Sequence, residues 1–500
     1  MTDIPQDRAA PVTGSAPKAQ PLKIVTKHNF ISWTALGFMT VAAVASLRAA
    51  PTMAVFGLAS VFLYVVPAVV FLLPQTLVAA ELASGWPGGI YRWVTEAYGP
   101  LFGLIAIWCQ FAMTIFYYPA LLAYVASTFA YVIDPRLASN GLYTAIVIIA
   151  LYWVAVIVSS RGMKANAGLA SGGMLVGTLI PGVVLVGMGI AYLLGGHTSA
   201  APMTTGTILP VWAGIASLVL IVNNFLSYAG MEMNAVHVSD LKDPPREFPK
   251  AMLLALPLVL LIFILPALAI AWVVPSGDVS LTAGVMQAFT AFFGHFGVAF
   301  LVPVVAFAVI AAMLGGMLTW VAGPSTGLLL IGREQGFLPP YFQKLNKRGM
   351  QVNLFVAQGI VTSIIACLYA FIPSVSSAYW IFEVMTTQIY LIVYVLMFIT
   401  AVKLRRDQPD HPRGYRVPAL TLLCVVGLLS TIAAFLIGFV PPSQFGSGHT
   451  IVYILLVAAG VGIVGPGVPL LLYKLRKPSW KTAEATTGTV GFASSTETEA

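Results

Sequence analysis

The sequence predicts an all-α integral membrane protein with twelve transmembrane helices. Hydrophobic residues make up 59% of the 500-residue chain and charged residues only 8%, whereas a soluble protein carries about 25% charged residues. The apolar residues form long continuous stretches with little alternation, which favours helices over a membrane β-barrel. The Lys and Arg residues lie almost entirely in every second connection between these stretches.

Twelve apolar stretches are long enough to cross a hydrocarbon core of about 30 Å as helices. They lie at residues 30–49, 56–80, 99–129, 141–159, 168–194, 211–237, 250–273, 297–329, 352–372, 379–401, 418–440 and 451–473. We expect them to form one domain over residues 29–477. Residues 1–28 and 478–500 contain no long apolar run, so we expect them to be disordered tails.

The positions of the basic residues predict the orientation. If the N-terminus is cytoplasmic and the twelve helices alternate, 23 of the 25 Lys and Arg residues face the cytoplasm, and only Arg48 and Arg136 do not. Cytoplasmic loops carry such an excess. We therefore expect a multi-pass membrane protein with both termini in the cytoplasm. The basic residues would meet lipid headgroups of the bilayer rather than nucleic acid, and the oligomeric state is left open.

The first and sixth stretches share an unusual composition at matching places. The residues concerned are Ala45, Ser46, Leu47 and Arg48 in the first stretch and Ser227, Tyr228, Ala229, Gly230 and Glu232 in the sixth. Small residues and glycine allow a helix to break. Because five stretches separate the two places, the first ten divide into two sets of five, at about 30–194 and 211–401. The last two stretches, at about 418–473, stand outside this repeat.

Inverted repeats in transporters place interrupted helices at matching positions, with the substrate site between them. A carboxylate within the membrane is costly and usually functional, so we expect Glu232 in a water-accessible cavity, where it gates the path or exchanges a proton. The alternative is a carboxylate satisfied by a neighbouring Ser or Tyr. Arg48 belongs to the same site or else extends to the outer membrane surface.

Several long blocks resemble one known family. "LSYAGMEMNAVHVSDLKDPPREFPKAMLL" (226–254), "VAAELASGWPGGIYRWV" (78–94) and "WVAGPSTGL" (320–328) resemble the bacterial glutamate:γ-aminobutyrate antiporters of the amino acid–polyamine–organocation superfamily. The resemblance covers roughly residues 28–475. It implies a LeuT-like five-plus-five inverted repeat with the first and sixth helices broken. It also implies alternating access and a substrate that is an amino acid or its decarboxylated amine.

The resemblance also implies site residues outside the two interruptions. Tyr390 and Tyr394 look like the family's tyrosine pair on the tenth helix, and their spacing puts them on one face; an aromatic core pair is the alternative. Trp320 looks like part of the family's eighth-helix block, and Gln110 is a polar candidate on the third helix. The chain departs from the family at Gly316, where the acid-resistance antiporters have a glutamate. The first interruption and the short C-terminal tail also differ.

These observations predict a secondary active amino-acid transporter, most simply an antiporter of the glutamate/γ-aminobutyrate type. The alternative is a proton-coupled symporter for neutral or other amino acids. We expect no enzyme activity, because the G-x-S-x-G match at 323–327 ends a membrane helix and has no triad context. There is no phosphate-binding loop with the Gly-Lys-Ser/Thr pattern of ATP-driven pumps. The six histidines show no ligand spacing, so we expect neither metal nor cofactor.

Overall fold

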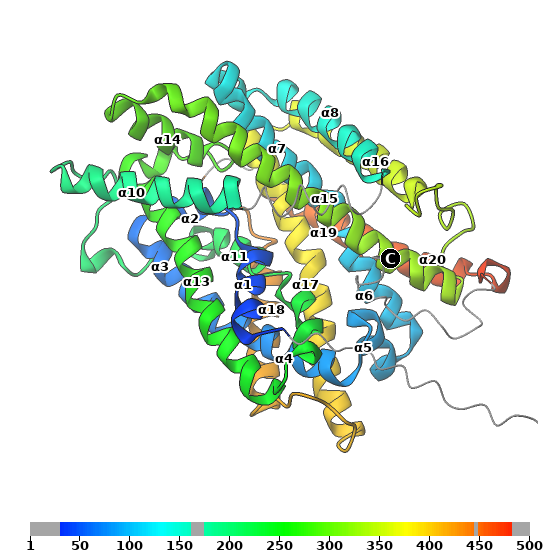
Figure 1. The fold of residues 1–500 in the computed structure, drawn as a ribbon. Helices are drawn as coiled ribbons and strands as arrows, with labels where there is room; N and C mark the ends of the chain where they lie inside the picture. Colours follow the sequence, from blue (N-terminus) through cyan, green and yellow to red (C-terminus); the bar gives the residue numbers. More distant parts are fainter. Residues whose placement is uncertain (1–30, 162–174, 445–448, 483–500) are drawn as a thin grey trace, which may run out of the picture.

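The fold is built from helices. The computed structural model describes residues 31–161, 175–444 and 449–482, and within these ranges all regular structure is helical (Figure 1). The α-helices are α1 (Trp33–Val44), α2 (Ala50–Ala54), α3 (Ser60–Pro67), α4 (Leu73–Gly85), α5 (Gly89–Tyr98), α6 (Pro100–Ala112), α7 (Thr114–Ile133), α8 (Gly141–Ser159), α10 (Ile180–Leu194), α11 (Val222–Ser227), α12 (Met231–Asn234), α13 (Pro244–Val273), α14 (Gly284–His295), α15 (Val302–Gln335), α16 (Val352–Cys367), α17 (Val375–Asp407), α18 (Leu420–Ile437), α19 (Thr450–Gly462) and α20 (Val468–Leu475). The predicted tail at 1–28 and residues 483–500 of the second predicted tail lie outside the described residues.

Ten helical segments of the described chain are long and apolar enough to cross a membrane. They run over residues 57–85, 100–133, 141–159, 176–194, 244–273, 299–335, 352–370, 375–407, 420–437 and 450–475. The predicted all-helical class is therefore confirmed. The two predicted spans that do not form such a segment are the first and the sixth, where we expected interruptions. The total of twelve spans stays a prediction.

Both expected interruptions are present. α1 ends at Val44, the backbone is extended at Ala45 (φ −60°, ψ 116°), and α2 begins only at Ala50. α11 ends at Ser227 and α12 begins at Met231. Between them Gly230 has a φ of 102°, a conformation that glycine adopts without a steric penalty. The glycine thus permits the break that the sequence predicts.

The helices form two groups joined by α17. In one group α1, α2 and α3 pack on α13, and α4 packs on the 3-10 turns at Ala235–Asp240, which follow α12. In the other group α7 and α8 pack with α15 and α16. α17 contacts members of both groups and crosses the middle of the molecule in Figure 1. It is the most buried of the ten segments, because 83% of an apolar 18-residue stretch within it is buried.

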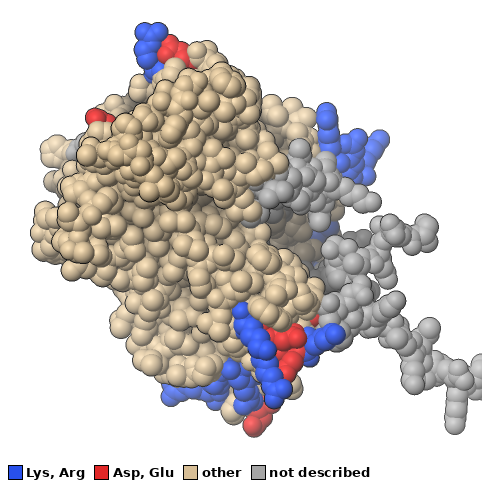
Figure 2. All heavy atoms as spheres, turned by 60° about the vertical axis from the view of Figure 1, so that its left-hand side comes forward, with Lys and Arg blue, Asp and Glu red and all other residues tan. Residues whose placement is uncertain are grey.

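On the face of the bundle drawn in Figure 2, the visible charged side chains lie at the margins. Figure 2 shows a broad face whose centre carries no Lys, Arg, Asp or Glu. Arg136, one of the two basic residues that we expected away from the cytoplasm, lies 2.8 Å from Asp134 (Nη2 to Oδ2). Its hydrogen bonds hold the pKa of the Asp134 carboxyl below the usual range. Because this pair is neutral as a unit, it adds no net positive charge at its end of the bundle.

Helical structure continues past residue 478, where we expected a disordered tail to begin. Pro478–Trp480 forms a 3-10 turn. The Gln343 side chain donates to the carbonyl of Trp480 at 2.8 Å, and the N–H of Thr482 donates to the carbonyl of Arg333 at 3.3 Å. These bonds hold the segment against the end of α15. Composition gives no sign of this contact, because its partners lie far away in the sequence.

The close approach of α18 to α17 gives a test of the packing. A Cβ added at Gly427 would lie 2.4 Å from Cζ of Phe398. We expect Gly427→Ala to destabilise the protein by about 1–3 kcal/mol, the usual range for overpacking a filled interior. Thermal unfolding in detergent measures this. Gly187→Ala on α10 is the matched control, since a Cβ there meets no atom within 4 Å; equal melting temperatures for the two variants would contradict the packing.

Candidate functional site

A cavity of about 250 Å³ lies where the two interrupted helices meet α7, α13, α15 and α17. It is lined by Ala42, Val44, Ala45, Ser46, Arg48, Ala49, Met113, Tyr117, Leu121, Thr178, Leu226, Ser227, Ala229, Phe263, Ala312, Met313, Gly316, Trp320 and Tyr390. Pockets for drug-sized ligands measure roughly 300–1,000 Å³. The smaller cavity therefore suits a molecule of amino-acid size.

Seven of the residues predicted for the site line this cavity. They are Ala45, Ser46, Arg48, Ser227, Ala229, Trp320 and Tyr390. The remaining six do not line it: Leu47, Gln110, Tyr228, Gly230, Glu232 and Tyr394. Leu47 and Tyr228 are buried, and the Tyr228 hydroxyl donates to the carbonyl of Tyr64 at 2.8 Å. The structure thus places Tyr228 in the packing between helices and not along the path that we expected it to line.

Glu232 lies directly behind the cavity wall. Its carboxylate accepts hydrogen bonds from the Tyr390 hydroxyl, from the Tyr394 hydroxyl at 2.8 Å and from the N–H of Gly230 at 2.9 Å. No described Lys, Arg or His forms an ion pair with it. All three neighbours act as donors, which suits the ionised carboxylate. Glu232 is therefore held without a counter-ion, by α17 and by the break in its own helix.

Tyr390 connects Glu232 to the cavity. Its ring lines the cavity, and its hydroxyl donates to the carboxylate. Trp320 lies next to the break, since a Cβ added at Gly230 would lie 3.6 Å from the Trp320 ring. The predicted tyrosine pair thus shares one face of α17, and both members bond one carboxylate.

Arg48 is buried and paired, so it does not extend to the membrane surface. Its Nη1 lies 2.7 Å from both carboxylate oxygens of Glu383 and 3.2 Å from the Tyr379 hydroxyl. Its guanidinium lies 5.2 Å from the centre of the Tyr117 ring. Arg48 is the only charged residue in the lining. Because Glu383 neutralises it, the cavity carries no net charge.

The sequence did not lead us to several lining residues or to the partner of Arg48. Met113, Tyr117 and Leu121 lie on α7 or directly before it, and their spacing of four residues places them on one helix face. That pattern could have indicated them. Glu383 could have been found as the acid of the tenth span that matches the single arginine of the first. Thr178 and Phe263 carry no comparable signal.

The sequence matches one known protein family over most of its length. A family model described as amino acid permease matches residues 31–463. The chain belongs to the amino acid permease family. It is therefore a multi-pass membrane protein of a family of transporters.

Two relatives agree with this assignment. The chain is 36% identical to an uncharacterized transporter of Legionella pneumophila, over 82% of this chain and 89% of that protein. It is 30% identical to a glutamate/γ-aminobutyrate antiporter of Lactococcus lactis, over 87% of this chain and 89% of that protein. The resemblance drawn from the sequence blocks is thereby confirmed.

A solved structure agrees with the fold. MhsT, whose crystal structure was determined in complex with L-phenylalanine, matches with a TM-score of 0.50 and 14% identity. The match covers 82% of this chain and 98% of that one. This similarity concerns the fold alone and confirms the LeuT-like architecture of the permease.

Gly316 offers a test of the cavity. It lines the space, and an added Cβ there meets no atom within 4 Å, so a larger side chain would project into the cavity. We expect Gly316→Leu to raise the apparent KM for the transported amino acid about tenfold, equivalent to about 1.4 kcal/mol, without preventing folding. Uptake into proteoliposomes measures the change. Gly462→Leu on α19, also in open space, is the control, and an unchanged KM in Gly316→Leu would argue against this cavity as the site.

Proposed function

We propose that this permease is a secondary active amino-acid exchanger of the glutamate/γ-aminobutyrate type that works by alternating access. The observation that carries the proposal is the cavity between the two interrupted helices. In inverted-repeat transporters the substrate binds at such interruptions, and one helix group rocks against the other. The two helix groups that α17 joins provide the two parts that this rocking motion requires.

The lining favours a substrate with an amino group and a carboxylate. Ala45, Ser46, Ser227 and Ala229 have short side chains, so the backbone at both interruptions is accessible from the cavity. Interrupted helices bind charged substrate ends with such backbone groups. The Tyr117 and Trp320 rings and the Met313 side chain complete the wall with aromatic and apolar surface.

The charge balance favours a substrate that is neutral overall. Arg48 and Glu383 compensate each other at the edge of the cavity, and Glu232 lies behind the lining, where Tyr390 donates to it, so no side chain that lines the cavity offers an unpaired charge to a substrate. A zwitterion such as γ-aminobutyrate or a neutral amino acid meets this condition. At least one member of the exchanged pair is therefore a zwitterion.

Glu232 is assigned the coupling role. A carboxylate that is buried without a counter-ion and bonded to a residue of the substrate cavity responds to events in that cavity. Occupation or emptying of the cavity moves Tyr390 and alters the donors to Glu232. That change gates the path or transfers a proton.

We infer that the protein lies in the bacterial inner membrane with both termini in the cytoplasm. The support is the distribution of Lys and Arg along the chain, together with the pairing of Arg136 by Asp134 at the opposite end.

Uptake of labelled glutamate into proteoliposomes tests the exchange. The vesicles are preloaded with γ-aminobutyrate, glutamine, arginine or buffer, at acidic and neutral pH. We expect uptake only with a counter-substrate inside, and the most effective counter-substrate identifies the pair. Uptake into empty vesicles driven by a proton gradient would indicate the symporter instead. If no glutamate enters under any condition, the glutamate/γ-aminobutyrate specificity is wrong, and the same measurement is repeated with labelled neutral and basic amino acids.

The coupling role of Glu232 has its own test. Gln cannot ionise, and its single side-chain oxygen cannot replace the two carboxylate oxygens that accept three hydrogen bonds in Glu232. We therefore expect Glu232→Gln to reduce exchange at least tenfold and to flatten the dependence of exchange on pH. Binding of the amino acid, measured separately, should fall less than exchange. Glu334→Gln, at an exposed position near the end of α15, is the control. Exchange at the wild-type rate and with the wild-type pH profile in Glu232→Gln would remove this role.

A further inference from the structure

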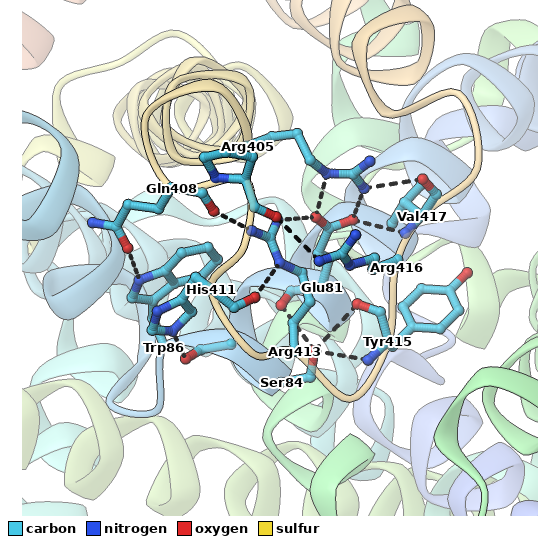
Figure 3. Close-up of polar contacts among 12 residues, drawn as sticks. Glu81, Ser84, Trp86, Arg405, Gln408, His411, Arg413, Tyr415, Arg416 and Val417 are labelled. Atoms are coloured by element: carbon cyan, nitrogen blue, oxygen red, sulfur yellow. Dashed lines mark hydrogen bonds and ion pairs between the residues drawn. The ribbon is translucent and has the colours of Figure 1, made fainter.

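A second buried acid, Glu81 near the end of α4, lies beside Arg405 and Arg413 (Figure 3). We call the end of the bundle that carries the basic residues of segment 403–416 the basic side. Arg405 donates from Nε to its Oε1 at 2.7 Å and from Nη2 to its Oε2. Arg413 donates from Nη1 to Oε1 at 2.9 Å, and the N–H of Val417 donates to Oε2 at 2.7 Å. One carboxylate thus holds two guanidinium groups and a backbone N–H.

The whole connection between α17 and α18 docks on the end of α4. Ser84 exchanges hydrogen bonds with the backbone of Tyr415, at 3.1 Å to its N–H and 3.3 Å to its carbonyl. The ring of His411 stacks on that of Trp86 at 4.5 Å and bonds the carbonyl of Gly85 at 2.8 Å. We call this set of contacts between residues 81–86 and 405–417 the α4 latch.

The same connection also touches α13. Tyr415 packs against Phe248, with 5.1 Å between the ring centres. Burial, and then the charge of Glu81, raise the pKa of the Tyr415 hydroxyl to about 12, so this ring is neutral at physiological pH. The connection therefore rests on both α4 and α13, which belong to the same helix group.

α4 carries the latch to the candidate site. Gln75 donates from Nε2 to the carbonyl of Tyr228 at 2.7 Å, within the break of the sixth segment. The Thr76 hydroxyl lies 3.8 Å from the sulfur of Met231. Further along, α4 packs on Ala235–Asp240. A displacement of the sixth segment toward or away from α17 is thus transmitted through α4 to Glu81.

We propose that Glu81, with Arg405 and Arg413, forms the inner gate of the transport cycle, and that the α4 latch must part for the cavity to open toward the basic side. This inference rests on the proposed function. Glu81 and Arg413 are almost fully buried when the latch is closed, with 3% and 0% of their side chains exposed, whereas Arg405 is 31% exposed. The latch therefore lies at the boundary with water.

The chemistry of the latch suits a contact that opens and closes. Charged groups regain their hydration when water reaches them, and this offsets much of the lost Coulomb attraction. Apolar side chains that become exposed to water in the same way gain no favourable hydration to offset the lost contact. A permanent join between helices needs no charge, whereas a reversible one at the membrane surface benefits from it.

A disulfide across the latch gives the sharpest test. A Cβ added at Gly414 would lie 3.7 Å from Cβ of Ser84, within the roughly 3.5–4.5 Å that a disulfide requires. The double variant Ser84→Cys with Gly414→Cys is reconstituted in full-length protein. Its exchange rate is measured after oxidation and again after reduction. We expect at least a tenfold loss on oxidation and recovery on reduction, with amino-acid binding retained.

Three controls separate the possible causes. The double variant Ser84→Ala with Gly414→Ala tests the two substitutions without a thiol. Each single cysteine variant tests a thiol that cannot form the bridge. The parent protein tests whether oxidation acts through Cys109, Cys367 or Cys424. Equal exchange rates for the bridged and reduced protein would overturn the gate and leave the latch a fixed bracket. No exchange by the reduced protein or the parent would overturn the proposed function and the gate together.

A labelling experiment keeps the proposal testable if the double variant folds poorly. Ser84→Cys alone is exposed to a membrane-impermeant maleimide that reaches the basic side. We expect labelling to become at least threefold faster during exchange than in protein without substrate, because the parted latch exposes this position. Equal labelling rates in the two conditions would contradict the gate.

Discussion

Four buried charged residues of the described chain, Arg48, Glu81, Glu232 and Glu383, are held through one helix, α17. Arg48 is paired with Glu383, Glu232 is bonded by Tyr390 and Tyr394, and Glu81 is bonded by Arg405. Glu383 and Arg405 are 22 residues apart, or about 33 Å along a helix, which matches a hydrocarbon core of about 30 Å. Unpaired charges in such a core are costly. The position of α17 is therefore a condition for the stability of both interrupted helices.

The same arrangement organises the candidate transport path. The three polar contacts with α17 lie at one end, near the centre and at the other end of the helix. The central one adjoins the cavity, and the outer two connect α17 to the group that contains α1, α4 and α13. In the transport cycle proposed above, rocking of this group relative to α17 alters all three contacts at once and so links a substrate bound at the centre to the closure of both ends.

The departures from the antiporter pattern have a physical meaning in this setting. Gly316 adds open space to the cavity wall where a side chain would otherwise project. Arg48 brings a positive charge to the first interruption, but Glu383 removes its net effect. The residues that line the resulting cavity carry no net charge once Glu383 is paired with Arg48. Its recognition of substrate consequently depends on backbone groups, aromatic surface and size, and less on a charged side chain.

The sequence by itself determined the membrane class, the approximate spans and the places of the two interruptions. These depend on local properties: apolar stretches set the spans, and Ala45, Ser46 and Gly230 weaken the helix where they stand. It also placed the tyrosine pair on one face, because helical spacing alone decides that. Helix content and the places of the two interruptions were therefore largely predictable.

Only the tertiary structure decided which side chains face each other. Arg48 and Glu383 are 335 residues apart, and Glu81 meets its arginines across a similar separation. Tyr228 turned toward Tyr64 and away from the expected path. The rotation and tilt of a membrane helix are set by packing against its neighbours, so hydropathy and motif spacing do not contain this information. The neutral cavity and the α4 latch arise from that packing.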